Sequence, residues 1–550
     1  MIDRRMALSL AILLLLAFFP EGLAAQDDEG ALSAINTEEL GDFEEYDDLV
    51  VVSRGRMKPF AIHAREELIY LFGKSALDSR SPEENYLRLL FARDEFFDAP
   101  WFTAGSELAD ALFDGRRSLS ATEVVDARDR MVDLVTKAQA LADSHRSGDE
   151  VDKDRLKSAE TLREQIMDLF GRVNRMRDPL ADLRYLPDPT SSSGEWLNHE
   201  EARAFVSRGH DLLRPGVEAF EKLEKSFLSR DAAAFRASVY ALMNAQRAVT
   251  ESPDVNQTLL TPGMVRLELI YYAVDFKIVG LIVFALAGLF FLAQAVSLGA
   301  SRPPGRVSRG LGRAASGVMI LGILWNCWII AGHTAIAGRL PLKNLQEVYL
   351  VVLFFVPLIG LLLELILKSR VYSAMSTLLT VVGFTGSLFL DPQGYMIAPL
   401  VAILQSPWRQ VHILTIMLSY AILLVAFGLH AAYLCRVAFV RSAPDHPDAL
   451  ALDLDRKAYL LVAWGFLFLT IGISTGAAWG HSSWGRYWGW DPKEVWATVA
   501  WAIYALFLHL RIFFRAPRWL LALINIVGYA AILFTYFGVT YLLPGLHAYK

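Results

Sequence analysis

The segment HSSWGRYWGWDPKEVW, residues 481–496, is the part of the chain whose residue types and spacing most clearly suggest chemistry. It holds four of the chain's 13 tryptophans close to Asp491: Trp484, Trp488, Trp490 and Trp496. An interfacial aromatic belt spreads its indoles over many loops, whereas these stand together. If residues 484–491 are helical, Trp484, Trp488 and Asp491 share one face at spacings of four and three. The segment therefore predicts a flat aromatic shelf that suits a large planar ligand.

Two histidines are candidates to bind such a ligand through a metal. His412 stands at the start of an apolar segment, SPWRQVHILTIMLSYAIL, and His547 follows the last apolar segment in LLPGLHAYK. Two imidazoles that flank an aromatic shelf could supply the two axial ligands of a haem iron. A lone histidine at such a boundary is more often an ordinary interfacial residue. The hypothesis therefore requires that the two segments pack together.

The composition calls for both a soluble part and a membrane part. Of the 550 residues, 54% are hydrophobic and 20% are charged, and the mean hydropathy is +0.33. This is too apolar for a soluble enzyme and too charged for a chain that lies in the membrane throughout. The net charge of −6 is small and negative, which does not favour binding to nucleic acid. The two cysteines, Cys327 and Cys435, lie in apolar runs, which disfavours a disulfide framework or a zinc site.

The first half of the chain reads as an exported domain. Arg4 and Arg5 precede a short apolar core and then small residues, which predicts a signal peptide over residues 1–25. A retained membrane anchor is the alternative. Residues 26–265 repeat apolar side chains at three- and four-residue intervals, so we predict a mostly helical domain, to which we assign no role. Its segment GRMKPFAIHARE (55–66) stands out from its surroundings, yet its residue types indicate no particular chemistry.

The second half resolves into eight apolar stretches, each near the ~20 residues that a membrane helix needs. The fold class is therefore expected to be all-α, with a polytopic membrane helix bundle of about eight spans over residues 266–550. The stretches cover residues 278–298, 315–336, 348–367, 372–390, 411–434, 458–476, 494–510 and 519–541.

The basic residues between these stretches indicate the orientation, because cytoplasmic loops are enriched in Lys and Arg. The connections after the first, third, fifth and seventh stretches are the more basic ones. The exported domain, the tryptophan-rich loop 477–493 and the C-terminus are then expected outside the cytoplasm of a multi-pass protein in the bacterial inner membrane. Asp491, Pro492 and Glu494 have the types that begin a helix, so capping is a second explanation for Asp491.

Two further histidines lie deeper in the apolar stretches. At 1.5 Å per residue, His430 is ~27 Å beyond His412, and His509 is ~22 Å beyond Glu494. Ionisable residues inside membrane segments are candidates for function. Both could serve an inner-side haem route, although His430 is the weaker candidate, because packing is the favoured explanation for it.

Four blocks of this sequence resemble the cytochrome c assembly protein family, in particular its system II branch with the tryptophan-rich WWD domain. The blocks are GRLPLKNLQEVYLVV (338–352), VHILTIMLSYAILL, WGRYWGWDPKEVWATVAWAIYALFLHLR and GVTYLLPGLHAYK. They occur in family order over most of residues 320–550. The exported domain does not resemble the family's partner protein, called CcsB or ResB. We therefore do not interpret the chain as a fusion of the two.

The resemblance implies binding of b-type haem outside the cytoplasm and its delivery to the Cys-x-x-Cys-His sequence of apocytochrome c. It implies His412 and His547 as axial ligands, the shelf of Trp484, Trp488, Trp490 and Asp491, and an inner role for His509. Cytochrome c haem lyase activity together with a CcsB/ResB-like partner is a further implication. Arg486, Arg339 and Lys343 could pair with the haem propionates, although solvated loop cations explain them as well.

Other classes of function stay open at this stage. A b-type haem electron-transfer subunit would carry paired histidines on facing spans, and His412 with His430 resembles half of that pattern. A haem or solute transporter without a role in attachment would show internal repeats or helices broken near the membrane midplane. No repeat is evident, and Pro357 alone interrupts a stretch. A purely structural scaffold leaves the density of tryptophans unexplained.

Overall fold

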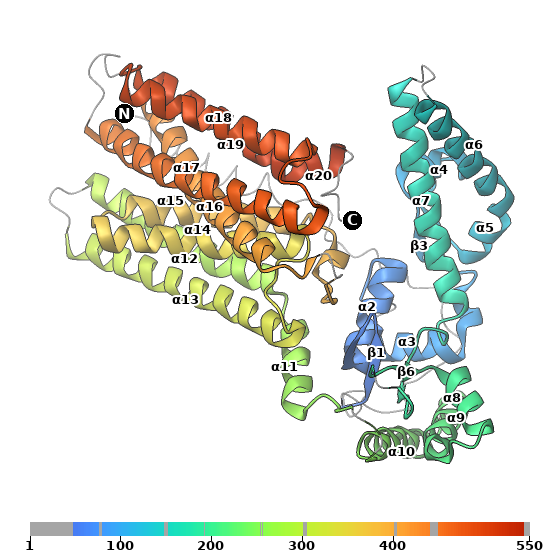
Figure 1. The fold of residues 1–550 in the computed structure, drawn as a ribbon. Coiled ribbons are helices and arrows are strands. Elements are labelled where there is room, and N and C mark those ends of the chain that lie inside the picture. Colours follow the sequence, from blue (N-terminus) through green and yellow to red (C-terminus); the bar gives the residue numbers. More distant parts are fainter. Residues whose placement is uncertain are drawn as a thin grey trace. The chain divides into compact units, whose positions relative to one another are not determined.

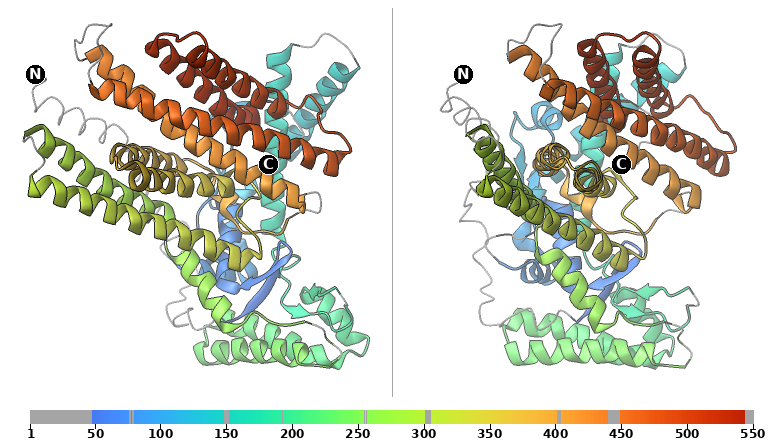
Figure 2. Two further views of the ribbon diagram at one scale, coloured as in Figure 1. Left: turned by 60° about the vertical axis from the view of Figure 1, so that its left-hand side comes forward. Right: turned by 90° about the vertical axis from the view of Figure 1, so that its left-hand side faces the viewer.

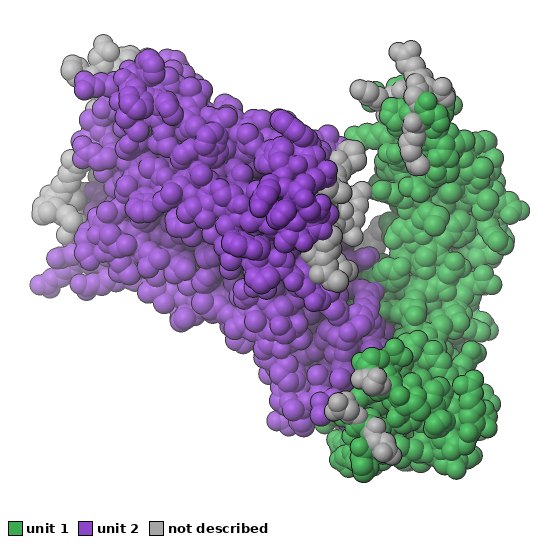
Figure 3. Space-filling view, in the orientation of Figure 1, with its two compact units in different colours: residues 1–49, 64–257 green, residues 50–63, 258–550 purple. Residues whose placement is uncertain are grey.

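The computed structural model describes most of the chain after the N-terminal segment. The described residues are 48–75, 77, 80–147, 152–191, 193–253, 255, 257–300, 305–400, 404–439 and 449–543. The predicted signal peptide (1–25) and His547 lie outside them. Two compact units are present: unit 1 comprises residues 1–49 and 64–257, and unit 2 comprises residues 50–63 and 258–550 (Figure 3). A short N-terminal segment is thus part of the second unit.

Unit 1 is built almost entirely from helices, as the three- and four-residue periodicity predicts. Two short strand pairs, β3 (Phe102–Thr103) with β4 (Ser118–Leu119) and β5 (Leu186–Pro187) with β6 (Trp196–Leu197), complete it. Its helices are α3 (Pro82–Phe91), η3 (Arg93–Phe96), α4 (Ser106–Leu112), α5 (Ala121–Asp126), α6 (Arg128–Arg146), α7 (Lys153–Arg177), α8 (His199–Ser207), η4 (Asp211–Leu213), α9 (Arg214–Ser229) and α10 (Ala232–Thr250), and α2 (Phe60–Phe72) joins it to unit 2.

Local sequence explains where these helices begin and turn. Ser120 and Glu123 form a capping box at the start of α5, and Asn198 and Glu201 form another at the start of α8. The α9–α10 pair turns at Arg230, whose φ of 59° is left-handed, after which Asp231 caps α10. Two long helices of this unit, α6 and α7, also pack together. These features account for the unit's fold and leave its role open.

Unit 2 is a bundle of long apolar helices, which lie side by side in Figures 1 and 2. It contains α11 (Pro262–Ala273), α12 (Phe276–Ala300), α13 (Arg306–Ala337), α14 (Leu345–Leu367), α15 (Val371–Ser387), η5 (Pro392–Tyr395), α16 (Pro407–Phe439), α17 (Ala449–Trp484), α18 (Pro492–Ile512), α19 (Arg518–Leu533), the π-turn η7 (Phe534–Gly538) and α20 (Val539–Leu542).

The bundle confirms the expected all-α, multi-pass membrane fold. Seven of the described helices are long and apolar enough to cross a membrane, with α19, η7 and α20 counted as one span. The remaining apolar stretch is α15, which has 17 residues and packs on α14 and α12. Several helices extend beyond the stretches predicted from hydropathy. In particular, α17 continues to Trp484 rather than ending near residue 476.

Three hydrophobic clusters lie in the described part of the bundle, and the smallest packs α11, α13 and α14 together around Tyr271, Ile329 and Leu350. A second joins α12, α13, α14 and α15 around Phe284, Met319 and Phe384. The largest joins α14, α16, α17, α18 and α19. Glycines bring α16 and α17 close together, because a Cβ on Gly465 would meet Leu423 at 2.5 Å and one on Gly472 would meet Ile416 at 2.5 Å. This close approach positions His412 against α17.

The N-terminal segment of unit 2 is a β-hairpin formed by β1 (Val50–Ser53) and β2 (Arg56–Pro59). Its two-residue turn, Arg54–Gly55, has positive φ at both positions, 52° and 78°. That is the geometry of a type I′ turn, which matches the twist of the paired strands. The turn residue Gly55 and strand β2 are the first five residues of the segment GRMKPFAIHARE.

Candidate functional site

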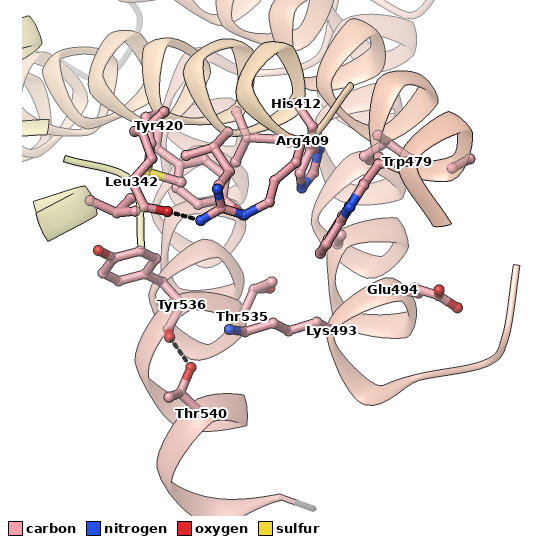
Figure 4. Close-up of a pocket in the computed structure, with 18 of the residues that line it drawn as sticks. Leu342, Arg409, His412, Tyr420, Trp479, Lys493, Glu494, Thr535, Tyr536 and Thr540 are labelled. Atoms are coloured by element: carbon pink, nitrogen blue, oxygen red, sulfur yellow. Dashed lines mark hydrogen bonds between the residues drawn. The ribbon is translucent and has the colours of Figure 1, made fainter. Parts of the chain in front are cut away.

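A pocket opens in unit 2 where the ends of α14, α16, α17, α18 and the last helix meet (Figure 4). The empty space in it, including the part that is open to solvent, amounts to about 1240 Å³. Its aromatic and polar lining includes Lys343, Arg409, His412, Tyr420, Trp479, Trp484, Tyr487, Trp488, Lys493, Glu494, Thr535, Tyr536 and Thr540. The site thus combines predicted shelf residues with one predicted axial ligand.

His412 is held in one orientation by α17. Its Nδ1 lies 2.7 Å from the Gly472 carbonyl oxygen, which can only accept a hydrogen bond. Nδ1 therefore carries the proton, and the lone pair resides on Nε2. A Cβ on Gly476 would lie 2.7 Å from the same ring, so glycine at this position makes room for the imidazole. The ring also stacks on Trp479, with centroids 6.2 Å apart and planes at 21°.

Three tryptophans line the pocket beside His412: Trp479, Trp484 and Trp488. Trp479 is 3% exposed and its ring centroid lies 4.9 Å from that of Trp484. Sequence reasoning gave Trp479 no role in the site, although it precedes Trp484 by five residues on what the structure resolves as one helix. Recognition that α17 continues through this region would have placed both rings on the pocket wall.

The shelf differs in detail from the helical arrangement expected for residues 484–491. Helix α17 ends at Trp484, and the chain is irregular from Gly485 to Asp491. Trp490 has a φ of 58°, is 77% exposed and does not line the pocket. Its ring is nearly perpendicular to that of Trp488, with 6.2 Å between centroids. The geometry brings Trp484 and Trp488 into the pocket and directs Trp490 elsewhere.

Asp491 acts as the cap of α18. Its Oδ1 accepts a hydrogen bond from the Lys493 amide at 3.0 Å. In return, the Glu494 Oε2 accepts from the amides of Asp491 at 3.2 Å and Gly489 at 2.7 Å. One carboxylate oxygen therefore fixes the backbone on both sides of Trp490. The capping role weighed from the sequence is present, and it orders the whole loop.

The pocket is bordered by more positive than negative side chains. Lys343, Arg409 and Lys493 line it together with one acid, Glu494. Arg409 is 3% exposed and donates to the carbonyl oxygens of Leu342 and Leu404. Figure 4 shows Lys493 extending toward Thr535. Sequence reasoning missed Arg409 and Lys493, because neither belongs to a motif that points to an anionic ligand.

The three cations proposed for propionates occupy different settings. Arg339 donates to both oxygens of Glu347, at 2.7 and 2.8 Å, and does not line the pocket. Arg486 is exposed and its guanidinium covers Gly489, where a Cβ would meet it at 2.7 Å. Lys343 lines the pocket. Burial lowers the pKa of its amine, Glu347 raises it, and the charges of Arg339 and Arg54 lower it further.

The two histidines expected on the inner side have different surroundings. His430 is fully buried, with Nδ1 2.7 Å from the Asn525 amide nitrogen and Nε2 3.8 Å from Asp455. Asp455 also pairs with Arg511 at 2.7 Å, so His430 belongs to a packed polar cluster. His509 is exposed on α18 and its Nδ1 donates to the Ala505 carbonyl at 2.8 Å. His430 thus has the environment of a structural residue.

The last helix contributes a part of the pocket wall that hydropathy did not reveal. The π-turn η7 interrupts it, and Thr535, Tyr536 and Thr540 face the cavity from this region (Figure 4). The Tyr536 hydroxyl donates to the Leu345 carbonyl at 2.8 Å, which ties this helix to the start of α14. Single π-helical turns inside α-helices, known as π-bulges, are frequent at functional sites. His547 follows Thr540 by seven residues and lies outside the described residues.

Comparison with known proteins is consistent with this arrangement. The family described as Cytochrome C assembly protein matches residues 342–547, which include every residue that lines the pocket. The cytochrome c biogenesis protein CcsA of Chlamydomonas reinhardtii is 32% identical over 217 residues, 39% of this chain. The match spans 62% of that relative, so less than two thirds of its length is covered.

Two cyanobacterial relatives are covered more fully. CcsA of Prochlorococcus marinus (strain MIT 9303) is 31% identical over 293 residues, which are 44% of this chain and 92% of that protein. CcsA of Synechococcus sp. (strain CC9902) is 35% identical over 240 residues, which are 39% of this chain and 79% of that protein. The chain therefore belongs to the cytochrome c assembly protein family, as a CcsA-like multi-pass membrane protein of cytochrome c biogenesis.

Proposed function

We propose that this protein binds b-type haem in the pocket and presents it to apocytochrome c outside the cytoplasm of a bacterial cell. The observation that carries the proposal is the setting of His412. Its Nδ1 proton is donated to a backbone carbonyl, and the ring stands in an aromatic pocket. Metal-binding histidines are typically oriented in this way by a hydrogen bond from the second ring nitrogen.

The pocket residues fit a planar, largely apolar ligand with two carboxylates. Trp479, Trp484 and Trp488 would contact the faces or edges of the macrocycle. Lys343 and Lys493 would pair with the propionates, because both line the cavity. Arg409 would add positive charge while it holds the backbone of Leu342. His412 would be one axial ligand, and His547 is proposed as the other.

Presentation of haem requires positioning more than acid–base chemistry. Bound haem would supply the vinyl groups, and each apocytochrome cysteine would add its S–H across one vinyl C=C bond. The protein's own residues would hold the macrocycle still, exclude water from the iron and leave an edge accessible. Haem lyase activity together with a CcsB/ResB-like membrane partner remains part of this proposal. The exported domain and the C-terminus would lie on the side where attachment occurs.

The inner-side route is proposed through His509. Its exposed position on α18 would allow contact with a ligand at the inner end of the bundle, whereas His430 is enclosed by Asn525 and Asp455. A route through His509 would deliver haem toward the pocket near the start of the same helix, where Lys493 and Glu494 stand.

The test compares the absorption spectrum of the purified protein with that of His412→Ala. His145→Ala is the matched control, because His145 is exposed on α6 of unit 1 and does not line the pocket. We expect His412→Ala to lose normal axial ligation, with partial recovery when imidazole is supplied, while the control keeps the wild-type spectrum. Equal spectra for all three proteins would contradict the proposal.

A further inference from the structure

The β1–β2 hairpin lies outside residues 342–547, which the family matches, yet it belongs to unit 2 and contacts the segments next to the pocket. Arg56 forms a two-pronged ion pair with Glu268 of α11, with nitrogen–oxygen distances of 3.0 and 2.5 Å. The side chains of this pair are only 12% and 3% exposed. Bidentate pairs between arginine and carboxylate combine strength with geometric specificity. The hairpin is therefore anchored at one defined place.

From this anchor the hairpin holds the segment that follows η5. The Arg56 Nε donates to the Ile397 carbonyl at 3.0 Å, and Arg54 contacts the Met396 sulfur at 2.9 Å. Gly55 approaches Pro399, because a Cβ there would lie 3.4 Å from the proline ring. Arg54 adopts a left-handed φ of 52°, which is costly for a residue with a side chain. The turn is thus fitted to residues 396–399.

Residues 394–398 in turn hold the segment that carries Lys343. The Ala398 carbonyl accepts from Arg339 at 2.8 Å, and the Gly394 carbonyl accepts from Asn344 at 2.7 Å. The backbone amide of Lys343 itself donates to Glu347 at 2.7 Å. A continuous chain of polar contacts therefore runs from the hairpin to the pocket wall formed by Leu342–Leu345.

We propose that the β1–β2 hairpin positions Lys343 in the pocket, so that the N-terminal region of the chain sets the carboxylate-binding edge of the site. Arg56 acts as the mechanical anchor through Glu268 and Ile397. Arg54, whose side chain contacts the Met396 sulfur, ties the turn of the hairpin to the same segment. The inference rests on the proposed function for the identity of the ligand, and it assigns a role to the segment GRMKPFAIHARE that residue types alone did not suggest.

The experiment reverses the charge of Arg56 and then re-forms the ion pair by reversing the charge of Glu268 as well. Arg56→Glu separates the hairpin from α11, and the double variant Arg56→Glu/Glu268→Arg re-forms the pair with opposite polarity. Arg184→Glu is the matched control, since Arg184 makes a comparable two-pronged pair with Glu201 at 2.8 and 3.1 Å in unit 1. All proteins are full-length and purified from membranes.

The first readout is amide hydrogen exchange in residues 338–345, measured without haem. Exchange should rise in Arg56→Glu, fall part of the way back in the double variant, which regains the pair with α11 but not the bond to the Ile397 carbonyl, and stay unchanged in Arg184→Glu. The second readout is affinity for haem compared with haem dimethyl ester, which lacks the carboxylates. The wild type should prefer the free acid, and Arg56→Glu should lose this preference by about tenfold, the size expected for one charge-assisted hydrogen bond.

Unchanged exchange in Arg56→Glu, or exchange that rises without rescue in the double variant, would overturn the inference. So would an undiminished preference for the free acid in Arg56→Glu. If His412→Ala bound haem with the same affinity and spectrum as the wild type, the proposed function would instead be refuted. In that case the exchange measurement still decides whether the hairpin positions the Lys343 segment.

Discussion

Replacement of Gly476 by alanine should displace the His412 ring without removing its imidazole. The new Cβ would lie 2.7 Å from His412 Nδ1 and 2.8 Å from Cε1, closer than real Cβ contacts allow. The ring must therefore move, and its 2.7 Å hydrogen bond to the Gly472 carbonyl is weakened or lost. Gly476→Ala thus tests whether the orientation of His412, and not only its presence, determines ligand binding.

The expected cost follows from three contributions. Overpacking costs about 1–3 kcal/mol, and loss of the hydrogen bond costs about 0.5–1.5 kcal/mol. Alanine has a higher helix propensity than glycine, which stabilises the helix by at most about 1 kcal/mol. With the full 1 kcal/mol gained from alanine, the sum is a net destabilisation of about 0.5–3.5 kcal/mol, which the thermal unfolding midpoint of the detergent-solubilised protein would report.

The informative assay is the haem absorption spectrum and affinity of Gly476→Ala. Gly317→Ala is the control, because a Cβ at Gly317 in α13 would meet nothing within 4 Å. We expect Gly476→Ala to bind haem more weakly with altered bands, and Gly317→Ala to behave as wild type or to be slightly more stable. A Gly476→Ala protein with normal spectrum and affinity would refute the reasoning that α17 orients His412.

Three further predictions concern the loop, the charge and the topology. Trp488→Ala should lower the haem retained on purification whereas Trp490→Ala should not, because only Trp488 lines the pocket; equal losses would contradict this division. Since the pKa of Lys343 is lowered, its positive charge is lost at a lower pH than that of an ordinary lysine as the pH rises. Haem affinity should then weaken in that alkaline range in the wild type but not in Lys343→Arg, as titration of binding against pH would measure. A reporter fused after Lys550 should be active only if it functions outside the cytoplasm, and activity restricted to a cytoplasmic reporter would place His547 on the wrong side.

Hydropathy was sufficient to predict the membrane bundle, because apolar length alone determines which segments can span a bilayer. It was less successful at helix ends. The sequence HSSWGRYW contains glycine and polar residues typical of a loop, yet α17 continues through His481 to Trp484. The packing of Trp479 on His412 and Trp484 outweighs the weak helix propensity of these residues. The end of the helix therefore depends on tertiary contacts.

The candidate site was predictable where a motif carries it and unpredictable where the fold assembles it. His412, Trp484 and Trp488 follow from residue type and spacing, and the structure brings them to one cavity. Arg409 and Lys493 could not be selected, since nothing in sequence separates a pocket cation from a solvated one. The contact between Arg56 and Glu268 joins residues 212 positions apart, a pairing that a single sequence does not encode in any local pattern.

The central claim is that haem binds in this pocket with His412 as an axial ligand. The most direct measurement is an electron cryomicroscopy map of the full-length protein loaded with haem. The account predicts a planar density between His412, Trp479 and Lys493, with the iron bonded to His412 Nε2. A haem elsewhere in the bundle, or an iron ligated without His412, would contradict it.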